Sequence, residues 1–255
     1  MNTMTEKKKI ADKNEPVVSV IIATYNAGKF LEECLASIAA QAFTSIEIIV
    51  IDGGSTDDTV KIAKAFDKLP LTLVSEPDKG IYDALNKGAK IAKGKWLHFL
   101  GADDILLPGF SELAAKLQDA DTIYYGDSKE YYDAGVKPDF IILTGRFSKY
   151  RLAKYCMNHQ AIIYPSSVFK KYHYQLKYKV LADYALNIVV WGDNDFKQEY
   201  HPVFIARYNM NGFSSLNKDE LFNKEKNTLI KKYMGWPVYL RLVFKQIKKR
   251  ILREP

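Results

Sequence analysis

The stretch IEIIVIDGGSTDDTVKIAKAFDKLPLTLV, residues 46–74, decides the fold class. It opens with a run rich in isoleucine and valine, which is typical of a strand buried on both faces. The sequence DGGS ends this strand, and Thr56 or Asp57 can cap a helix that we expect to reach about Asp67. A second apolar strand is predicted at residues 71–74. Strand, helix and strand in this order predict a parallel βαβ unit.

The flanking segments continue this alternation. Strands are predicted at residues 17–24 (VVSVIIAT) and 96–100 (WLHFL), and helices at residues 29–41 and 81–93. Gly94 stands where a C′ glycine would end the second of these helices. The alternation predicts an α/β fold with a parallel sheet, in which ligands bind at the carboxyl ends of the strands.

The second half of the chain is less regular. We expect strands at residues 122–126, 160–164 and 196–208, and an antiparallel excursion over residues 128–140. Helices are expected at residues 182–190, 218–233 and 237–253.

The composition indicates one large α/β domain with an appendage, because the chain has 255 residues, of which 47% are hydrophobic. Cys34 and Cys156 lie far apart and form no disulfide framework, which fits a reducing cytoplasm. Residues 1–15 are polar and lack the apolar region of a signal peptide. We find no apolar run of the roughly 20 residues that a membrane span requires. A cytoplasmic protein is therefore expected.

The net charge of +7 is concentrated at one end of the chain. Residues 218–255 contain eleven Lys or Arg against four Asp or Glu, which accounts for the whole excess. The remainder is neutral, so the basic-domain class of nucleic-acid-binding proteins is excluded.

Asp103 and Asp104 follow the apolar strand WLHFL. Mg²⁺ and Mn²⁺ prefer oxygen ligands and accept phosphate oxygens beside carboxylates, so the pair is a candidate metal site. A cap on the following turn is the alternative explanation.

Two further polar clusters end predicted strands. Asp52 can accept hydrogen bonds from a base or a ribose, and it equally suits a turn that precedes a helix cap. Thr24, Tyr25 and Asn26 end the first strand, where Tyr25 could pack on a nucleobase and Asn26 could cap a helix.

Asp183 and His159 are the candidates in the second half. Asp183 lies near the start of an apolar helix, where it could complement the helix dipole or act as a general base. His159 precedes a strand, and a lone histidine there is more often structural than catalytic.

Three stretches in series, VSVIIATYNAGKFLEECLASIAAQ, IEIIVIDGGSTDDT and GIYDALNKGAKIAKGKWLHFLGADD, resemble the family 2 glycosyltransferases. The resemblance is strong over residues 16–109 and looser to about residue 212. It implies the type-A glycosyltransferase fold, a Rossmann-like mixed sheet flanked by helices. Residues 16–217 would be the transferase domain, divided into a nucleotide-sugar half (16–126) and an acceptor half (127–217). Residues 1–15 would be a flexible N-terminus and residues 218–255 a C-terminal helical appendage.

The resemblance also implies roles for individual residues. Asp183 would be the catalytic base, Asp104 the metal ligand with Asp103 beside the ribose or the metal, and His159 an acceptor-side residue. The donor-binding residues would be Thr24, Tyr25, Asn26, Asp52, Lys79 and Asp83. The implied reaction is inverting, metal-dependent transfer of a sugar from a nucleoside diphosphate, UDP above all. The cofactor would be Mn²⁺ or Mg²⁺, and the acceptor a hydroxyl of a glycan or a lipid-linked glycan in surface polysaccharide synthesis.

The sequence departs from the family at one position. Many members have Asp-x-Asp-Asp, whereas here Gly101 replaces the first acid. The metal would then depend on Asp104, with Asp103 as its partner.

The predicted helix at residues 237–253 is amphipathic and basic. Its apolar face is formed by Tyr239, Leu240, Val243, Phe244, Ile247 and Ile251, and its cationic face by Arg241, Lys245, Lys248, Lys249 and Arg253. Two interpretations remain open: docking to an anionic membrane surface, or packing on the body with a solvated cationic face.

Other functions fit less well. ATYNAGKF lacks the glycine-rich basic loop of a nucleotidyltransferase, DGGST lacks the second acid of an Asp-x-Asp phosphatase, and no GxGxxG follows a strand. The remaining alternative is a catalytically inactive, nucleotide-sugar-binding relative.

Overall fold

The structure is a computed structural model that describes residues 15–131, 143–210 and 217–251. Its described strands form one eight-stranded sheet in the order β3-β2-β1-β4-β7-β6-β8-β5. The strands are β1 (Val18–Thr24), β2 (Ile46–Asp52), β3 (Leu71–Ser75), β4 (Trp96–Gly101), β5 (Ile105–Leu106), β6 (Thr122–Tyr131), β7 (Ile162–Pro165) and β8 (Lys197–Asn209). The flexible N-terminus expected at residues 1–15 falls almost entirely outside the described residues.

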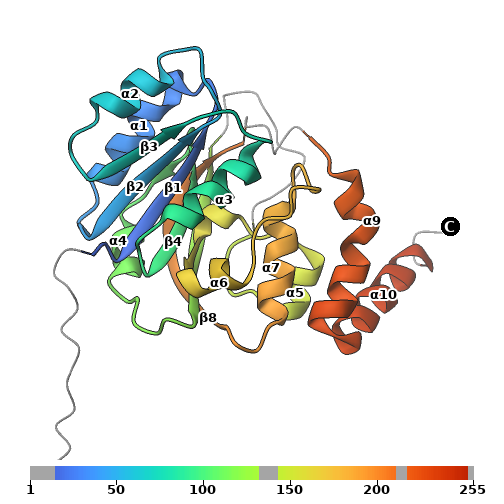
Figure 1. Cartoon of the computed structure of the whole chain (residues 1–255). Coiled ribbons are helices and arrows are strands. Elements are labelled where there is room, and N and C mark those ends of the chain that lie inside the picture. Colours follow the sequence, from blue (N-terminus) through green and yellow to red (C-terminus); the bar gives the residue numbers. More distant parts are fainter. Residues whose placement is uncertain (1–14, 132–142, 211–216, 252–255) are drawn as a thin grey trace, which may run out of the picture.

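Helices cover both faces of this sheet (Figure 1). They are α1 (Gly28–Ala39), α2 (Thr59–Ala65), α3 (Ile81–Ile91), α4 (Gly109–Ala114), α5 (Lys149–Lys154), α6 (Ser166–Lys171), α7 (Ala182–Gly192), α9 (Glu220–Leu229) and α10 (Trp236–Ile251). A 3₁₀ turn, η1 (His159–Ala161), and a π-helical segment, η2 (Ile230–Met234), complete the chain.

The first strand shows why the apolar runs are continuous. Val20 and Ile22 of β1 belong to the same core cluster as Leu31 of α1, on one face of the sheet. Ile21, between them, belongs to the cluster of Leu85 of α3, on the other face. Because successive side chains of a strand point to opposite faces, a strand covered on both sides is apolar along most of its length.

The parallel half of the sheet is confirmed. β1 pairs in parallel with β2 on one side and with β4 on the other, and β2 pairs in parallel with β3. Thr24 at the end of β1 lies opposite Asp52 at the end of β2. The carboxyl ends of these strands therefore form one edge, as expected from the βαβ pattern.

The antiparallel excursion expected at residues 128–140 is wrong for its described part. β6 continues to Tyr131 and pairs in parallel with β8. Register shifts between Tyr125 and Asp127, and between Asp127 and Ser128, bend the strand where a break was expected. Residues 132–140 of that prediction lie outside the described part of the chain.

Gly94 is not a C′ glycine, since the left-handed conformation is absent there. α3 ends at Ile91, and the Gly94 N–H donates to the Ser19 hydroxyl at 2.8 Å and to the Glu47 carboxylate at 3.2 Å. Those two bonds fix the entry into β4, and a glycine is needed there because a Cβ would lie 2.5 Å from the Ser19 backbone nitrogen.

The C-terminal helices pack against the side of the molecule formed by α5 and α7 (Figure 1). Gly192, the last residue of α7, allows close approach of η2, because a Cβ there would lie 2.1 Å from the Tyr233 carbonyl oxygen. Leu242 of α10 is buried at 4% exposure and joins the main core. None of the helices within the described ranges has the length and apolar character needed to span a membrane.

The predicted apolar face of α10 needs correction. Leu242 is the buried residue, whereas Leu240, Phe244 and Ile247 are 44%, 69% and 48% exposed. Packing on the body uses one side of the helix, and most of the predicted apolar face points to solvent. The predictions for Arg253, and for the side chains of Lys249 and Ile251, fall outside what the structure describes.

His98 of β4 joins the two halves of the sheet. Its ring is fully buried and its Nδ1 lies 3.1 Å from the carbonyl oxygen of Ile162, on the neighbouring strand β7. Burial lowers the pKa of His98 to about 4, because a charged imidazolium loses its hydration there. Native His98 is thus neutral at pH values where an unfolded histidine takes up a proton.

We expect His98 to destabilise the fold progressively as the pH falls from about 6.5 towards 4, by up to about 3 kcal/mol. The direction of this change follows from proton uptake. As the pH falls, His98 of the unfolded state binds a proton before native His98 does, and that binding stabilises the unfolded state. Urea unfolding of His98→Gln across this range should show a shallower loss of stability than the unmodified protein. His173→Gln, at an exposed histidine, is the matched control. Equal slopes for the unmodified protein and His98→Gln would contradict the assignment.

Candidate active site

Asp104 is the most enclosed acid of the site. It is 1% exposed, and each of its oxygens accepts hydrogen bonds from the protein. Oδ1 accepts from the Asn209 N–H at 2.8 Å, and Oδ2 accepts from Gln160 Nε2 at 2.6 Å and from the Gly101 N–H at 3.2 Å. A single carboxylate thereby connects the end of β4, the turn η1 and the end of β8.

Asp103 is the more accessible member of the pair. Its Oδ2 accepts from Asn209 Nδ2 at 3.1 Å. Burial raises the pKa of Asp103, and burial followed by the nearby Asp103 charge raises the pKa of Asp104 to about 7. Two crowded carboxylates with raised pKa values form a place where a cation would be stabilised.

A metal fits this site only as one shared with a ligand. Among the residues that the structure describes, no group of three or more His, Cys, Asp and Glu is arranged to hold a metal ion. Mg²⁺ is nevertheless commonly held by one or two carboxylates together with substrate phosphates. Asp103 has the exposure for this, whereas the oxygens of Asp104 already take three protein donors. This geometry does not favour the expected division of roles, in which Asp104 contacts the metal.

Gly101 explains why the first family acid is missing. A Cβ at this position would lie 2.3 Å from Asp104 Oδ2 and 3.1 Å from Asp103 Oδ1. A side chain at position 101 would therefore clash with Asp104 in its observed position. The glycine and this position of Asp104 are linked by that steric constraint.

Asp52 organises the loop at the ends of β1 and β2. It is fully buried, and its Oδ2 accepts from the N–H groups of Gly54 at 3.1 Å and Ser55 at 3.0 Å. The hydroxyls of Ser75, Ser55 and Thr24 also donate to it. Burial alone would raise the pKa of Asp52, but these hydrogen bonds outweigh burial and lower it. In this arrangement the N–H groups of residues 53–56 donate to Asp52 and to the end of β1, which fixes the shape of the loop.

Tyr25 and Asn26 lie on the rim of the same edge. Tyr25 is 68% exposed, while Asn26 has a positive φ of 50° and accepts from the Thr56 N–H at 2.9 Å. The Asn26 N–H in turn donates to the Ser55 hydroxyl at 2.8 Å. These bonds hold the two strand-end loops side by side and leave the Tyr25 ring free to stack on a planar group.

Lys79 and Asp83 form the turn that opens α3. The Lys79 N–H donates to Asp83 Oδ2 at 3.0 Å, so Asp83 stabilises the turn from inside the helix. Lys79 itself is exposed and lines a shallow hollow with Ile81, Tyr82 and Tyr178. The turn thus presents a cation near Tyr82, whose hydroxyl contacts Asp183.

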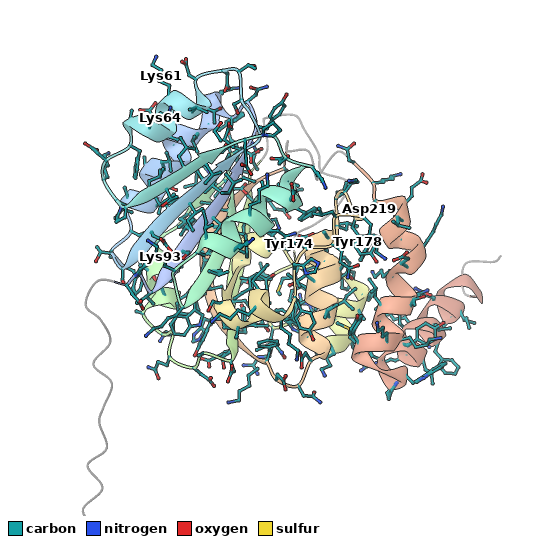
Figure 2. All side chains as sticks on the ribbon, in the orientation of Figure 1. Lys61, Lys64, Lys93, Tyr174, Tyr178 and Asp219 are labelled. Carbon is teal, nitrogen blue, oxygen red and sulfur yellow. The ribbon has the colours of Figure 1, made fainter. Side chains whose placement is uncertain are left out.

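Asp183 is in the first turn of α7 and is held on both oxygens. Tyr82 Oη lies 2.9 Å from its Oδ1, and His159 Nδ1 lies 2.9 Å from its Oδ2. The backbone just before the helix is fixed by Asp219, whose Oδ2 accepts from the N–H groups of Val180 and Leu181. Figure 2 shows Asp219 beside Tyr178, between α7 and α9. The Asp183 carboxylate is therefore oriented from three separate segments.

The turn η1 connects the base candidate to the acid pair. His159 contacts Asp183 and the next residue, Gln160, contacts Asp104. The sequence identified His159 but missed Gln160, Tyr82 and Asn209. Gln160 could have been noticed as the polar neighbour of His159, whereas no local pattern marks Asn209 or the hydroxyl of Tyr82.

Comparison with known proteins shows the family to which the chain belongs. The sequence model described as glycosyl transferase family 2 matches residues 19–176. The chain belongs to glycosyl transferase family 2. Such enzymes are glycosyltransferases, and the eight-stranded mixed sheet flanked by helices is the type-A glycosyltransferase fold.

Two relatives of this family 2 chain illustrate the range of similarity. A protein named PGL/p-HBAD biosynthesis glycosyltransferase, from Mycobacterium tuberculosis, is 35% identical over 226 residues, covering 82% of this chain and 83% of its own length. Glycosyltransferase GlyG from Streptococcus pneumoniae is 34% identical over 151 residues, covering 57% of this chain and 50% of its own.

Solved structures support the fold. S. aureus TarS 1-349, in complex with UDP-GlcNAc, aligns with a TM-score of 0.68 and 19% identity over 85% of this chain and 71% of that one. The mannosyltransferase PcManGT from Pyrobaculum calidifontis, in complex with GDP-Man and Mn²⁺, aligns with a TM-score of 0.59 and 16% identity. The alignment covers 87% of this chain and 63% of the mannosyltransferase.

Gly101→Ala should destabilise the protein by about 1–3 kcal/mol, because the new methyl group must displace the Asp104 carboxylate. The same substitution in an Asp104→Ala background should cost much less, since the obstructing oxygen is gone. Denaturant unfolding of both single variants and the double variant gives this coupling energy. Equal costs in the two backgrounds would show that Asp104 is not what excludes a side chain at position 101.

Proposed function

We propose that this family 2 enzyme is an inverting glycosyltransferase that moves a sugar from a nucleoside diphosphate, UDP above all, to an acceptor hydroxyl. The observation that carries the proposal is the turn η1, whose consecutive residues contact Asp183 and Asp104. This connection supports a reaction centre in which an acid pair for the diphosphate and a base for the acceptor act together.

The donor is proposed to bind along the carboxyl edge of the parallel strands. Tyr25 offers a ring for the nucleobase, beside the strand-end loop that Asp52, Thr24 and Asn26 hold in place. Lys79 offers a cation for phosphate oxygens, from a turn that Asp83 stabilises. We assign residues 16–126 to this donor half and residues 127–217 to the acceptor half.

Asp183 is proposed as the general base. Its carboxylate removes the proton of the acceptor hydroxyl as the oxygen attacks the anomeric carbon. Attack from the face opposite the diphosphate forms the new C–O bond, breaks the bond to the leaving phosphate oxygen, and inverts the anomeric centre. Fixed positioning of Asp183 by Tyr82 and His159 would supply part of the rate.

Mn²⁺ or Mg²⁺ is proposed to bind with the donor, held by Asp103 and by diphosphate oxygens. When bound, the ion neutralises charge on the leaving diphosphate. Asp104 is proposed to hold Asn209 in place through its hydrogen bonds, and Asn209 in turn holds Asp103. This assignment exchanges the roles of the two acids that the sequence resemblance implied.

The names of similar proteins suggest the substrate class. Structures similar to this chain hold UDP-GlcNAc or GDP-Man, and the mycobacterial relative is named for PGL/p-HBAD biosynthesis. We propose a glycan or a lipid-linked glycan as the acceptor, in surface polysaccharide synthesis.

Asp183→Asn should lower the transfer rate by at least about a thousandfold and leave the donor dissociation constant nearly unchanged, since Asn cannot accept the proton. Asp103→Asn should weaken donor binding in the presence of Mn²⁺ and have little effect without it. Calorimetric donor titration and a transfer assay measure the two effects separately. Asp58→Asn, at an exposed acid that pairs with Lys61, is the control for both.

Two results would contradict this proposal. Full transfer by Asp183→Asn would remove the base from that position. Donor binding by the unmodified protein without transfer or donor hydrolysis, in any metal, would favour the catalytically inactive relative.

We further propose that the enzyme works at the cytoplasmic face of a membrane and docks there through α10. Trp236, Leu240, Phe244 and Ile247 recur every three or four residues and are all exposed, so they form one apolar stripe. Leu242, which packs on the body, is two positions from Leu240 and from Phe244, about 200° around the helix. The stripe therefore points away from the protein.

The charges beside this stripe favour an anionic lipid surface. Arg241, Lys245 and Lys248 are exposed along one side of α10, and Lys231 lies 4.8 Å from the centre of the Trp236 ring. An apolar stripe flanked by cations is the pattern of a helix that lies in the plane of a membrane interface. We therefore propose that the two alternatives for this helix are compatible, with one side packing on the body and the other side facing lipid.

The protein should sediment with vesicles of phosphatidylglycerol and much less with vesicles of phosphatidylcholine. Phe244→Ser combined with Ile247→Ser should reduce this binding by about tenfold or more, because two apolar side chains no longer enter the interface. Phe30→Ser combined with Ile91→Ser, at exposed apolar residues away from α10, is the matched control. Substitution at these positions is preferable to deleting α10, since Leu242 is part of the core. No sedimentation of the unmodified protein with anionic vesicles would refute docking.

A further inference from the structure

The turn η1 is itself rigidly held between strands. Asn158 Oδ1 accepts from the Gln160 N–H at 3.0 Å, and the Asn158 carbonyl oxygen accepts from the Ala161 N–H at 3.1 Å. The next residue, Ile162, is fixed by the contact of its carbonyl oxygen with His98 Nδ1 at 3.1 Å. The directions of the His159 and Gln160 side chains are consequently set by the sheet, and not by the ligands that bind there.

Two side chains, His159 and Tyr82, contact the carboxylate of Asp183, and His159 is the one that donates to it without a competing acceptor in this contact. Tyr82 Oη has one proton and two acceptors, the Val180 carbonyl oxygen at 2.6 Å and Asp183 Oδ1 at 2.9 Å. Its shorter contact is to Val180, so its proton is shared away from the carboxylate. The His159 Nδ1–H faces Asp183 Oδ2 at 2.9 Å, with side chains only 15% and 10% exposed. A donor to the charged form stabilises an ionised carboxylate.

Gln160 makes an equivalent contact with the acid pair. Its Nε2 donates to Asp104 Oδ2 at 2.6 Å, and both residues are buried, at 3% and 1% exposure. Its Oε1 is also buried and has no hydrogen-bond partner among the described residues. An unsatisfied buried acceptor costs about 1–3 kcal/mol, which a residue with a purely structural role would be expected to avoid.

We propose that His159 and Gln160 are paired positioning residues. His159 orients Asp183 for the proton transfer, and Gln160 holds Asp104 so that Asp103 faces the donor diphosphate. The inference rests on the proposed function, since it requires Asp183 to be the base. It adds that one rigid turn sets the spacing between the donor site and the base.

Adjacent residues of the turn are therefore expected to affect different steps. Loss of the His159 N–H weakens proton removal and leaves donor binding intact. Loss of the Gln160 N–H loosens Asp104, and with it the donor site, and leaves the base unaffected. Removal of a hydrogen bond of this kind typically costs 10–100-fold in affinity or activity.

The pH dependence of the rate gives a specific readout for His159. The titratable groups facing Asp183 are Tyr82 from α3, Tyr164 from β7, and Cys156, His159 and Tyr174 from connecting segments. Burial raises the pKa of each of the three tyrosines, which takes them further from neutrality. The acidic limb of the profile reports the protonation of the catalytic base, so it is the limb in which loss of the His159 donor is read.

The first test compares His159→Phe with His159→Asn. Phe has no donor, so kcat should fall about 10–100-fold and the acidic limb of the kcat–pH profile should move to higher pH. The donor dissociation constant should not change. Asn places an N–H close to the position of Nδ1 and should restore most of kcat and the original limb. An unchanged limb and kcat in a folded His159→Phe, or no rescue by Asn, would overturn the role of His159.

The second test compares Gln160→Met with Gln160→Glu. Met keeps the length of the side chain without a donor, and Glu adds a charge next to Asp104. Donor binding in Mn²⁺ should weaken about tenfold or more in Met and further in Glu, while the acidic limb of the kcat–pH profile stays in place. Unchanged donor binding in both variants would overturn the role of Gln160. If Gln160→Met does not fold, the donor affinity of Gln160→Glu alone decides whether Gln160 has this role.

Asp183→Asn separates this inference from the proposed function. If that variant retains transfer, the base is elsewhere and the function fails whatever His159 does. If it is inactive while His159→Phe has wild-type kcat and pH profile, the function stands and only the positioning role fails.

Discussion

Asp104 is a buried carboxylate without a cationic partner among the described residues, and the arrangement of the site depends on satisfying it. A buried charge is costly unless hydrogen bonds compensate it. Its three donors come from the end of β4, from η1 and from the end of β8, which are far apart in sequence. To satisfy this one group, the parallel half of the sheet, the connecting turn and the last strand must meet at one point. These contacts close the inner side of the sheet edge at which ligands are proposed to bind.

The parallel half of the fold could be predicted because its signals are local. Strands buried on both faces require continuous runs of β-branched residues, and β1 and β2 have them. The continuation of β6 past Gly126 could not be predicted, since it depends on bulges set by its partner β8. The exposed apolar stripe of α10 could not be predicted for a similar reason, since an amphipathic pattern does not show which of its apolar residues pack on the body.

The site was predictable as a set of acids but not as an assembly. Asp52, Asp103, Asp104 and Asp183 all stand out at strand or helix ends. Their different environments come from distant partners, as when Asn209 donates to both members of the acid pair. Asp104 and Asp103 are neighbours in sequence, and only the long-range contacts make one buried and leave the other accessible. The exchange of roles that we propose for them was therefore beyond sequence reasoning.

The close approach of Gly192 to the Tyr233 carbonyl oxygen links the C-terminal tail to the helix of Asp183. The helix α7 begins at the base and ends on η2, which leads directly into α10. In mechanical terms, α7 is a strut whose far end rests on the segment that leads into α10. If α10 docks on lipid as proposed, a change in its depth in the lipid surface would be transmitted along α7 to the proposed base, Asp183.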